Sequence, residues 1–152
     1  MDNLSENLKN KIKSEMVVAM RAQNKARVSA IRLLTSEIKQ REVDNRIELD
    51  DAAVLAVIDK MLTQRRDSFN QYKQANREDL ATQEAYEMDV LKEFLPPQLS
   101  QLELNDLINK TIKTLGATTI KDMGKVMAEI KPQIQGRADV AEVSKTVKEL
   151  LS

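Results

Sequence analysis

Apolar residues recur at steps of three and four along most of the chain, which is the spacing of one face of an α-helix. The first stripe runs from about residue 3 to residue 21, with Leu4, Leu8, Ile12 and Met16 on one face. A second stripe follows Asn24, a residue type that favours helix starts, and is expected to end in the polar stretch 44–46. The pattern therefore begins with two amphipathic helices.

Two further helices are expected before residue 95. Asp50 or Asp51 precedes a third stripe, and Asn76 with Asp79 resembles a capping arrangement for a fourth. Arg65 falls on the apolar face of the third helix and is expected to be half-buried. Four helices joined by short loops predict an antiparallel bundle over residues 1–95.

The sharpest boundary in the pattern is the proline pair Pro96-Pro97. Both residues lack an amide hydrogen and fix φ, so the fourth helix is expected to end here and the pair to act as a hinge. Ser100 with Glu103 then forms a capping box for a new helix, and Gly116 is placed to end it.

Two shorter helices complete a small C-terminal domain over residues 96–152. One is expected to meet Pro132 in its last turn, and the other is capped by Asp139 with Glu142; Gly136 separates them. The predicted fold is thus all-α, an N-terminal antiparallel helical bundle followed by a three-helix tail. Only three Gly and three Pro in 152 residues support this prediction, because sheet proteins need more turn residues.

The absence of two residue types, Cys and His, limits the reactions that the chain can catalyse. The chain has no Cys, which excludes disulfides and thiolate nucleophiles, and no His, the usual general base near neutral pH. No metal site, cofactor or catalytic constellation is therefore expected. No apolar run is long enough to span a membrane and no signal peptide pattern is present, so we expect a cytoplasmic protein.

The acidic residues offer no clear active site. Glu84, Glu87 and Asp89 are expected on a polar helix face, and the pairs Asp50-Asp51 and Glu78-Asp79 lie at predicted helix starts. Carboxylates in the first turn favour the helix dipole, which is a sufficient reason for those pairs.

Basic residues are the more informative group, although Lys plus Arg equals Asp plus Glu at 24 each. The segment from Lys9 to Arg32 carries a surplus of cations that includes Arg27. This surplus is a candidate to contact phosphates. The alternative is a solvated helix face whose cations pair with carboxylates elsewhere. With aromatic residues at 3% of the chain, stacking on single-stranded bases is not supported.

A second basic group lies in the tail, where Lys121, Lys125 and Arg137 accompany two of the three glycines. Gly124 inside a predicted helix costs about 1 kcal/mol relative to Ala, which indicates close approach of another backbone. That backbone is either a neighbouring helix or a bound phosphate chain.

At these residues the chain resembles the GatB/YqeY family. The resemblance covers residues 4–151 approximately, and its carriers are residues 32–39 (RLLTSEIK), 64–68 (QRRDS), 94–100 (FLPPQLS), 121–127 (KDMGKVM) and 136–139 (GRAD). It implies a helical bundle with a three-helix tail. It also implies kinship with the C-terminal part of the B subunit of the tRNA-dependent amidotransferase, a carbon–nitrogen ligase that uses glutamine as amido donor.

In that enzyme the related tail helps to hold tRNA, whereas the kinase and transamidation chemistry resides in a separate catalytic domain and glutamine hydrolysis in another subunit. We expect no such catalytic domain in this chain. The resemblance therefore favours a stand-alone module that binds tRNA or a tRNA-handling complex, with a role in translation. Lys121, Lys125 and Arg137 are the first candidates for phosphate contact, and Arg27 and Arg32 are second. The rival interpretation is a protein-interaction module without RNA affinity. A third is an accessory, non-catalytic part in amide transfer.

Overall fold

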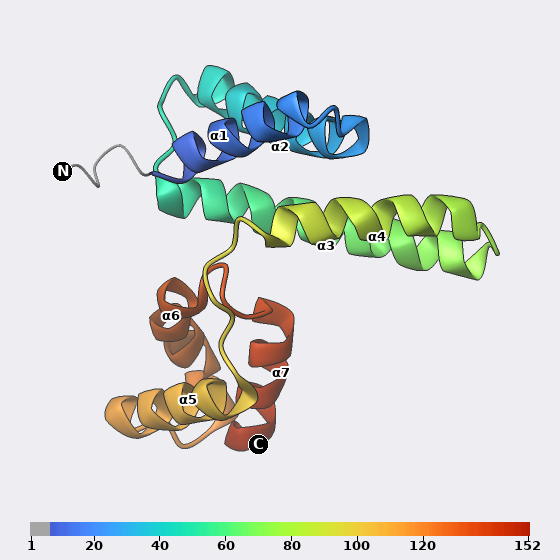
Figure 1. The fold of residues 1–152 in the computed structure, drawn as a ribbon. Helices are drawn as coiled ribbons and strands as arrows, with labels where there is room; N and C mark the ends of the chain where they lie inside the picture. The colour runs from blue at the N-terminus through green and yellow to red at the C-terminus, as the bar shows by residue number, and fades with distance from the viewer. Residues whose placement is uncertain (1–6) are drawn as a thin grey trace. The chain divides into compact units, whose positions relative to one another are not determined.

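The computed structural model describes residues 7–152, and within them the regular structure is entirely helical (Figure 1). The described chain divides into two compact units, which meet between Leu95 and Pro96. The all-helical prediction is confirmed.

The first unit contains four helices. They are α1 (Leu8–Arg21), α2 (Lys25–Asn45), α3 (Asp51–Gln74) and α4 (Glu78–Lys92). Asn24 caps α2 by accepting a hydrogen bond from the Arg27 amide at 3.1 Å, and Asp50 caps α3 through the Ala53 amide at 2.9 Å. The sequence predicted both caps. The predicted start of the first helix at residue 3 lies outside the described residues, within which Asn7 caps α1.

One expected cap is wrong. Asn76 does not start α4: the helix begins at Glu78 after Arg77, and no side chain caps it. Asn76 instead adopts a positive φ of 59°, and its amide donates to the Lys73 carbonyl at 3.1 Å, in the turn that follows α3. Asparagine tolerates the left-handed conformation better than most residues, so the same side chain type suits a helix end as well as a start.

The core of the first unit fills the space among α1, α2 and the adjoining parts of α3 and α4. Along α3 it reaches from Val54 to Leu62, and along α4 it includes Val90 and Leu91. Beyond these residues α3 and α4 continue side by side as a hairpin that projects past α1 and α2 (Figure 1). We call residues 63–87 of this hairpin the outer hairpin.

The second unit contains α5 (Gln101–Leu115), a short 3-10 helix η2 (Ile120–Asp122), α6 (Met123–Ile134) and α7 (Val140–Leu151). The Ser100–Glu103 capping box and the Gly116 C-cap form as predicted, with Gly116 at φ +64°. Pro132 lies in the last turn of α6. The unit has its own core, in which Ile108, Val126, Ile130 and Val147 are fully buried.

Candidate functional site

Arg27 is held inside the first unit by two carboxylates. Its Nη1 and Nη2 donate to the two oxygens of Glu93 at 2.7 and 3.1 Å, and Nη2 also donates to Glu15 at 3.0 Å. These bonds raise the pKa of Arg27, with the hydrogen bond to Glu93 as the main cause. The guanidinium therefore joins α1, α2 and the residue that follows α4, and its donors already face carboxylates. Lys9 is likewise paired, with Glu42 at 2.7 Å.

The tail candidates differ from Arg27 in their surroundings. Lys121 in η2 and Lys125 in the first turn of α6 are exposed, and neither forms an ion pair with another described residue. Asp122 lies between them, and its carboxylate accepts hydrogen bonds from the Thr118 and Thr119 amides at 3.0 and 3.3 Å. These bonds lower the pKa of Asp122, with a smaller contribution from Lys125.

Arg137 lies beyond the opposite end of α6, which spans roughly 18 Å at 1.5 Å per residue. The structure therefore brings Lys121 and Lys125 together but separates Arg137 from them by the length of the helix. Arg137 is half-buried, and its Nε donates to the Pro97 carbonyl at 3.1 Å. Arg32, on α2 of the first unit, is exposed.

Gly124 needs a different explanation from helix packing. A Cβ placed on this residue would meet nothing within 4 Å among the described atoms, and the residue is exposed. Of the two alternatives offered by the sequence, the approach of a neighbouring helix to Gly124 is therefore wrong among the described residues. The glycine leaves an open surface in the first turn of α6, next to Lys125.

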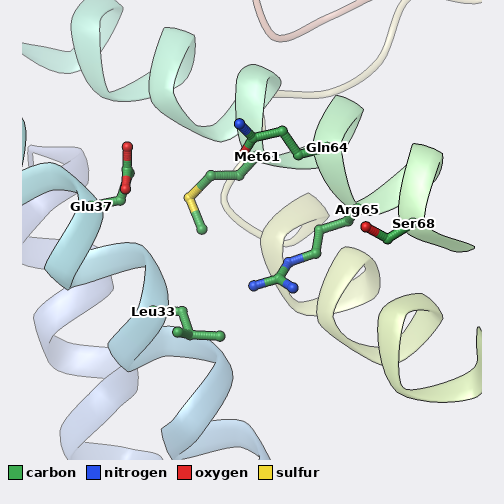
Figure 2. Close-up of a pocket in the computed structure, with 6 residues that line it drawn as sticks. All are labelled: Leu33, Glu37, Met61, Gln64, Arg65 and Ser68. Atoms are coloured by element: carbon green, nitrogen blue, oxygen red, sulfur yellow. The ribbon is translucent and has the colours of Figure 1, made fainter. Parts of the chain in front are cut away.

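A pocket of about 240 Å³ lies on the first unit between α2 and α3 (Figure 2). Leu33 and Glu37 line it from α2, and Met61, Gln64, Arg65 and Ser68 line it from α3. Figure 2 shows the Arg65 side chain extending from α3 towards α2. The Met61 thioether and Leu33 lie beyond its guanidinium, on the side of α2. Five of the six residues come from segments 32–39 and 64–68, two of those that carry the family resemblance.

Arg65 also joins two carboxylates of α4. Its Nη1 lies 3.1 Å from Glu84 Oε2 and 2.9 Å from Glu87 Oε2. The side chains of Glu84 and Glu87 are only 10% and 13% exposed, and that of Arg65 is 26% exposed. The expectation that these two glutamates lie on a polar face is therefore wrong, because they face the half-buried arginine across the outer hairpin.

The charge balance of this cluster is unfavourable to two ionised glutamates. Burial raises the pKa of Glu87, Arg65 opposes the rise, and the neighbouring Glu84 adds to it. Its buried Oε2 accepts no well-aligned hydrogen bond. One guanidinium thus faces two carboxylates that have little contact with water, and a net negative charge remains if both are ionised. The cluster therefore depends strongly on Arg65.

Two further features concern residues 7–152, a metal-binding group and a membrane-spanning helix. No three acidic side chains there converge in a way that would hold a metal ion. None of the helices in that range combines the length and the apolar character that a membrane crossing requires.

Comparison with known proteins identifies the family. The pattern described as Yqey-like protein matches residues 9–151, nearly the whole chain. The chain belongs to the YqeY-like family. The resemblance noted from the segments above is therefore confirmed.

Relatives of this YqeY-like chain include two fungal proteins. A protein of Pyrenophora tritici-repentis named "Altered inheritance of mitochondria protein 41, mitochondrial" is 27% identical over 144 residues, which cover 93% of this chain and 79% of its own. A protein of the same name from Saccharomyces cerevisiae is 28% identical over 125 residues, covering 78% and 68% respectively. The word "mitochondrial" belongs to the names of those proteins.

Sequence reasoning placed Arg65 correctly but did not find the YqeY-like chain's buried glutamates. The available signal was Arg65 itself: a cation on an apolar stripe needs an anion within the fold. Its partners Glu84 and Glu87 lie on the neighbouring helix of the hairpin, at positions set by the turn between α3 and α4.

Proposed function

We propose that this chain is a stand-alone module that binds tRNA, alone or within a tRNA-handling complex, through phosphate contacts made by its second unit. The observation that supports this most is the difference between the two basic groups. Lys121 and Lys125 are exposed without an ion pair among the described residues, whereas Arg27 is occupied by two carboxylates. When exposed cations contact the phosphates of RNA, the counterions condensed on the RNA are released, and this release favours binding.

The proposed contacts form two groups at opposite ends of α6. Lys121 and Lys125 supply point charges at its start, and Arg137 supplies donors beyond its end. Separate phosphates of one RNA strand therefore occupy the two ends. Arg32 remains a secondary candidate on the first unit, and we assign Arg27 a structural role.

The first test removes one proposed contact from each end. The Lys125→Ala, Arg137→Ala variant is expected to bind tRNA more weakly and with a salt dependence flatter by about two units in log K against log [salt], one for each lost contact. Fluorescence anisotropy across a salt titration measures both quantities. Lys110→Ala, Lys113→Ala is the matched control, because it removes two exposed cations from α5 of the same unit. An unchanged slope in the first variant, or an equal change in the control, contradicts the assignment.

Gly124→Ala provides a second test, in which stability and binding are expected to move in opposite directions. Alanine is the better helix former, and its methyl group meets no described atom, so the substitution is expected to stabilise the second unit by up to about 1 kcal/mol. The same methyl group stands beside Lys125, where the RNA backbone is proposed to approach, so tRNA affinity should fall. Urea denaturation and anisotropy measure the two effects. Stabilisation with unchanged affinity shows that no backbone approaches Gly124.

A protein-interaction module is the second candidate. The pocket between α2 and α3 favours it, because Leu33 is 43% exposed there beside Met61 and four polar groups, a mixture that suits an amphipathic partner. Failure of the wild-type chain to bind tRNA at low salt would leave this candidate in place. Because the chain has no His and no Cys, neither site contains the usual general base or a thiolate nucleophile, so we propose binding rather than ligase activity. A cytoplasmic location is part of the same proposal.

A further inference from the structure

Residues 96–99 are bonded to the turn between α6 and α7, although 38 residues separate the two segments at their contact. Gln98 Nε2 donates to the Gly136 carbonyl at 2.7 Å and to the Pro96 carbonyl at 3.2 Å. The Leu99 amide donates to the Arg137 carbonyl at 2.9 Å, and Arg137 Nε donates to the Pro97 carbonyl at 3.1 Å. Two of the segments that carry the family resemblance, 94–100 and 136–139, thus contact each other within the second unit.

The chemistry of the two segments explains why they pair. Pro96 and Pro97 lie outside the helices, so their carbonyls receive no helical hydrogen bond and accept from donors elsewhere. Gly136 adopts a positive φ of 74°, and the Arg137 amide donates back to the Ile134 carbonyl at 2.8 Å, which closes the turn at the end of α6. A side-chain carboxamide with two N–H groups can reach one carbonyl of each segment, and Gln98 does so.

These contacts constrain the Arg137 side chain at its inner end. With Nε on the Pro97 carbonyl, the two Nη groups form the edge of the guanidinium that remains for a ligand. That edge matches two oxygens of one phosphate. Glu103 is the acidic neighbour: Arg137 contributes to the lowered pKa of that carboxylate, although the hydrogen bonds to Ser100 are the main cause.

We propose that Gln98 is a positioning residue that holds the 136–137 turn against Pro96 and Pro97, and so presents the outer edge of Arg137 to a phosphodiester of the bound RNA. The proposal rests on the proposed function for its ligand. Its structural part, the dependence of Arg137 on Gln98, stands on the four hydrogen bonds alone. An arginine ordered before binding loses less side-chain freedom when the phosphate arrives.

The first experiment tests the structural part without RNA. In the wild-type chain the Arg137 Nε–H is expected to give a distinct, exchange-protected side-chain signal in a ¹H–¹⁵N NMR spectrum. Gln98→Ala and the nearly isosteric Gln98→Glu, which cannot donate to the two carbonyls, should each shift this signal and abolish its protection. Gln101→Ala is the matched control, because Gln101 Nε2 donates to Asn105 at 3.0 Å on the exposed side of α5. An unchanged Arg137 signal in a folded Gln98→Glu chain overturns the proposal.

The second experiment is a double-mutant cycle for tRNA binding. Gln98→Ala is expected to weaken binding by between about twofold and tenfold, the range for ordering one long side chain. In the Arg137→Ala background the same substitution should have no further effect, because Gln98 acts through Arg137. Equal losses in both backgrounds overturn the proposal, since they would come from Gln98 itself or from the fold.

The outcomes separate this inference from the proposed function. If the wild-type chain binds no tRNA, the proposed function fails, and the NMR experiment still decides whether Gln98 orders Arg137. If tRNA binds with the expected salt dependence but the cycle shows additive losses, the proposed function stands and the positioning role of Gln98 fails.

Discussion

Ile130→Ala is expected to unfold the second unit while the first unit remains folded. Ile130 is fully buried at the centre of the second core, on the helix that also carries Val126 and Ile134. Replacing a buried isoleucine by alanine costs about 2–5 kcal/mol, because the side chain leaves a cavity as well as losing its apolar contacts. A domain of this size rarely has more than about 3–5 kcal/mol of stability. A single core substitution therefore removes most or all of it.

The measurement is an amide NMR spectrum combined with a urea titration. Signals from residues 96–152 should collapse to unfolded positions, while signals from the first unit keep their dispersion, because the two cores share no residue. Leu102→Ala is the control: this leucine is 71% exposed on α5, so its removal should change stability by less than about 0.5 kcal/mol. Simultaneous loss of both sets of signals would mean that the units unfold as one.

Arg65→Ala is expected to destabilise the first unit by about 3 kcal/mol at neutral pH. The substitution leaves Glu84 and Glu87 without the cation that lies 3.1 and 2.9 Å from them. The penalty comes from two poorly hydrated carboxylates in contact, so it exceeds the value of an exposed salt bridge, which is about 0–1 kcal/mol. Thermal or urea denaturation measures the loss, and Lys60→Ala, an exposed cation on the same helix, serves as control.

The loss of stability caused by Arg65→Ala is expected to depend on pH, because Glu87 titrates in the cluster. Burial already raises the pKa of Glu87 in the folded chain, so folding favours the protonated carboxyl. The destabilisation caused by the ionised Glu87 is present above the pKa of this residue in the folded chain. It disappears as the pH falls towards the ordinary pKa of a glutamate. Without Arg65 the folded pKa rises further, so the defect of Arg65→Ala should shrink on mild acidification. Adding Glu87→Gln should restore part of the stability at neutral pH. A defect that is the same at all pH values would mean that lost packing, not charge, is its cause.

Local chemistry made the helix starts and ends predictable. Asn24, Asp50 and Ser100 cap helices because each supplies a side-chain oxygen to an amide three residues ahead, a relation visible in the sequence. Gly116 ends α5 for an equally local reason, its positive φ. The predicted cap at Asn76 was wrong because an asparagine can either start a helix or follow its end in the left-handed conformation, and neighbouring residues decide which occurs.

The arrangement of the sites was not predictable from local pattern. The spacing of Glu84 and Glu87 predicted a polar helix face. Only the pairing of α3 with α4 places them against Arg65. For Arg27 the sequence left phosphate contact and pairing with distant carboxylates as alternatives. The structure shows the pairing, with Glu15 on α1 and with Glu93 just after α4. For Gly124 the sequence left a neighbouring helix and a bound phosphate chain as alternatives. The structure excludes the first among the described residues, because no atom lies within 4 Å of a Cβ placed there.

The outer hairpin has a consequence for how this fold can change in length. Its residues lie beyond the part of α3 and α4 that contributes to the core of the first unit, which ends near Leu62 on one helix and near Met88 on the other. Matched insertions or deletions of whole helical turns on both sides of the 75–77 turn would lengthen or shorten the hairpin and leave that core intact. The tip is therefore the place in the first unit where related chains can differ in size at least cost, and where a reporter group can be attached without touching either core.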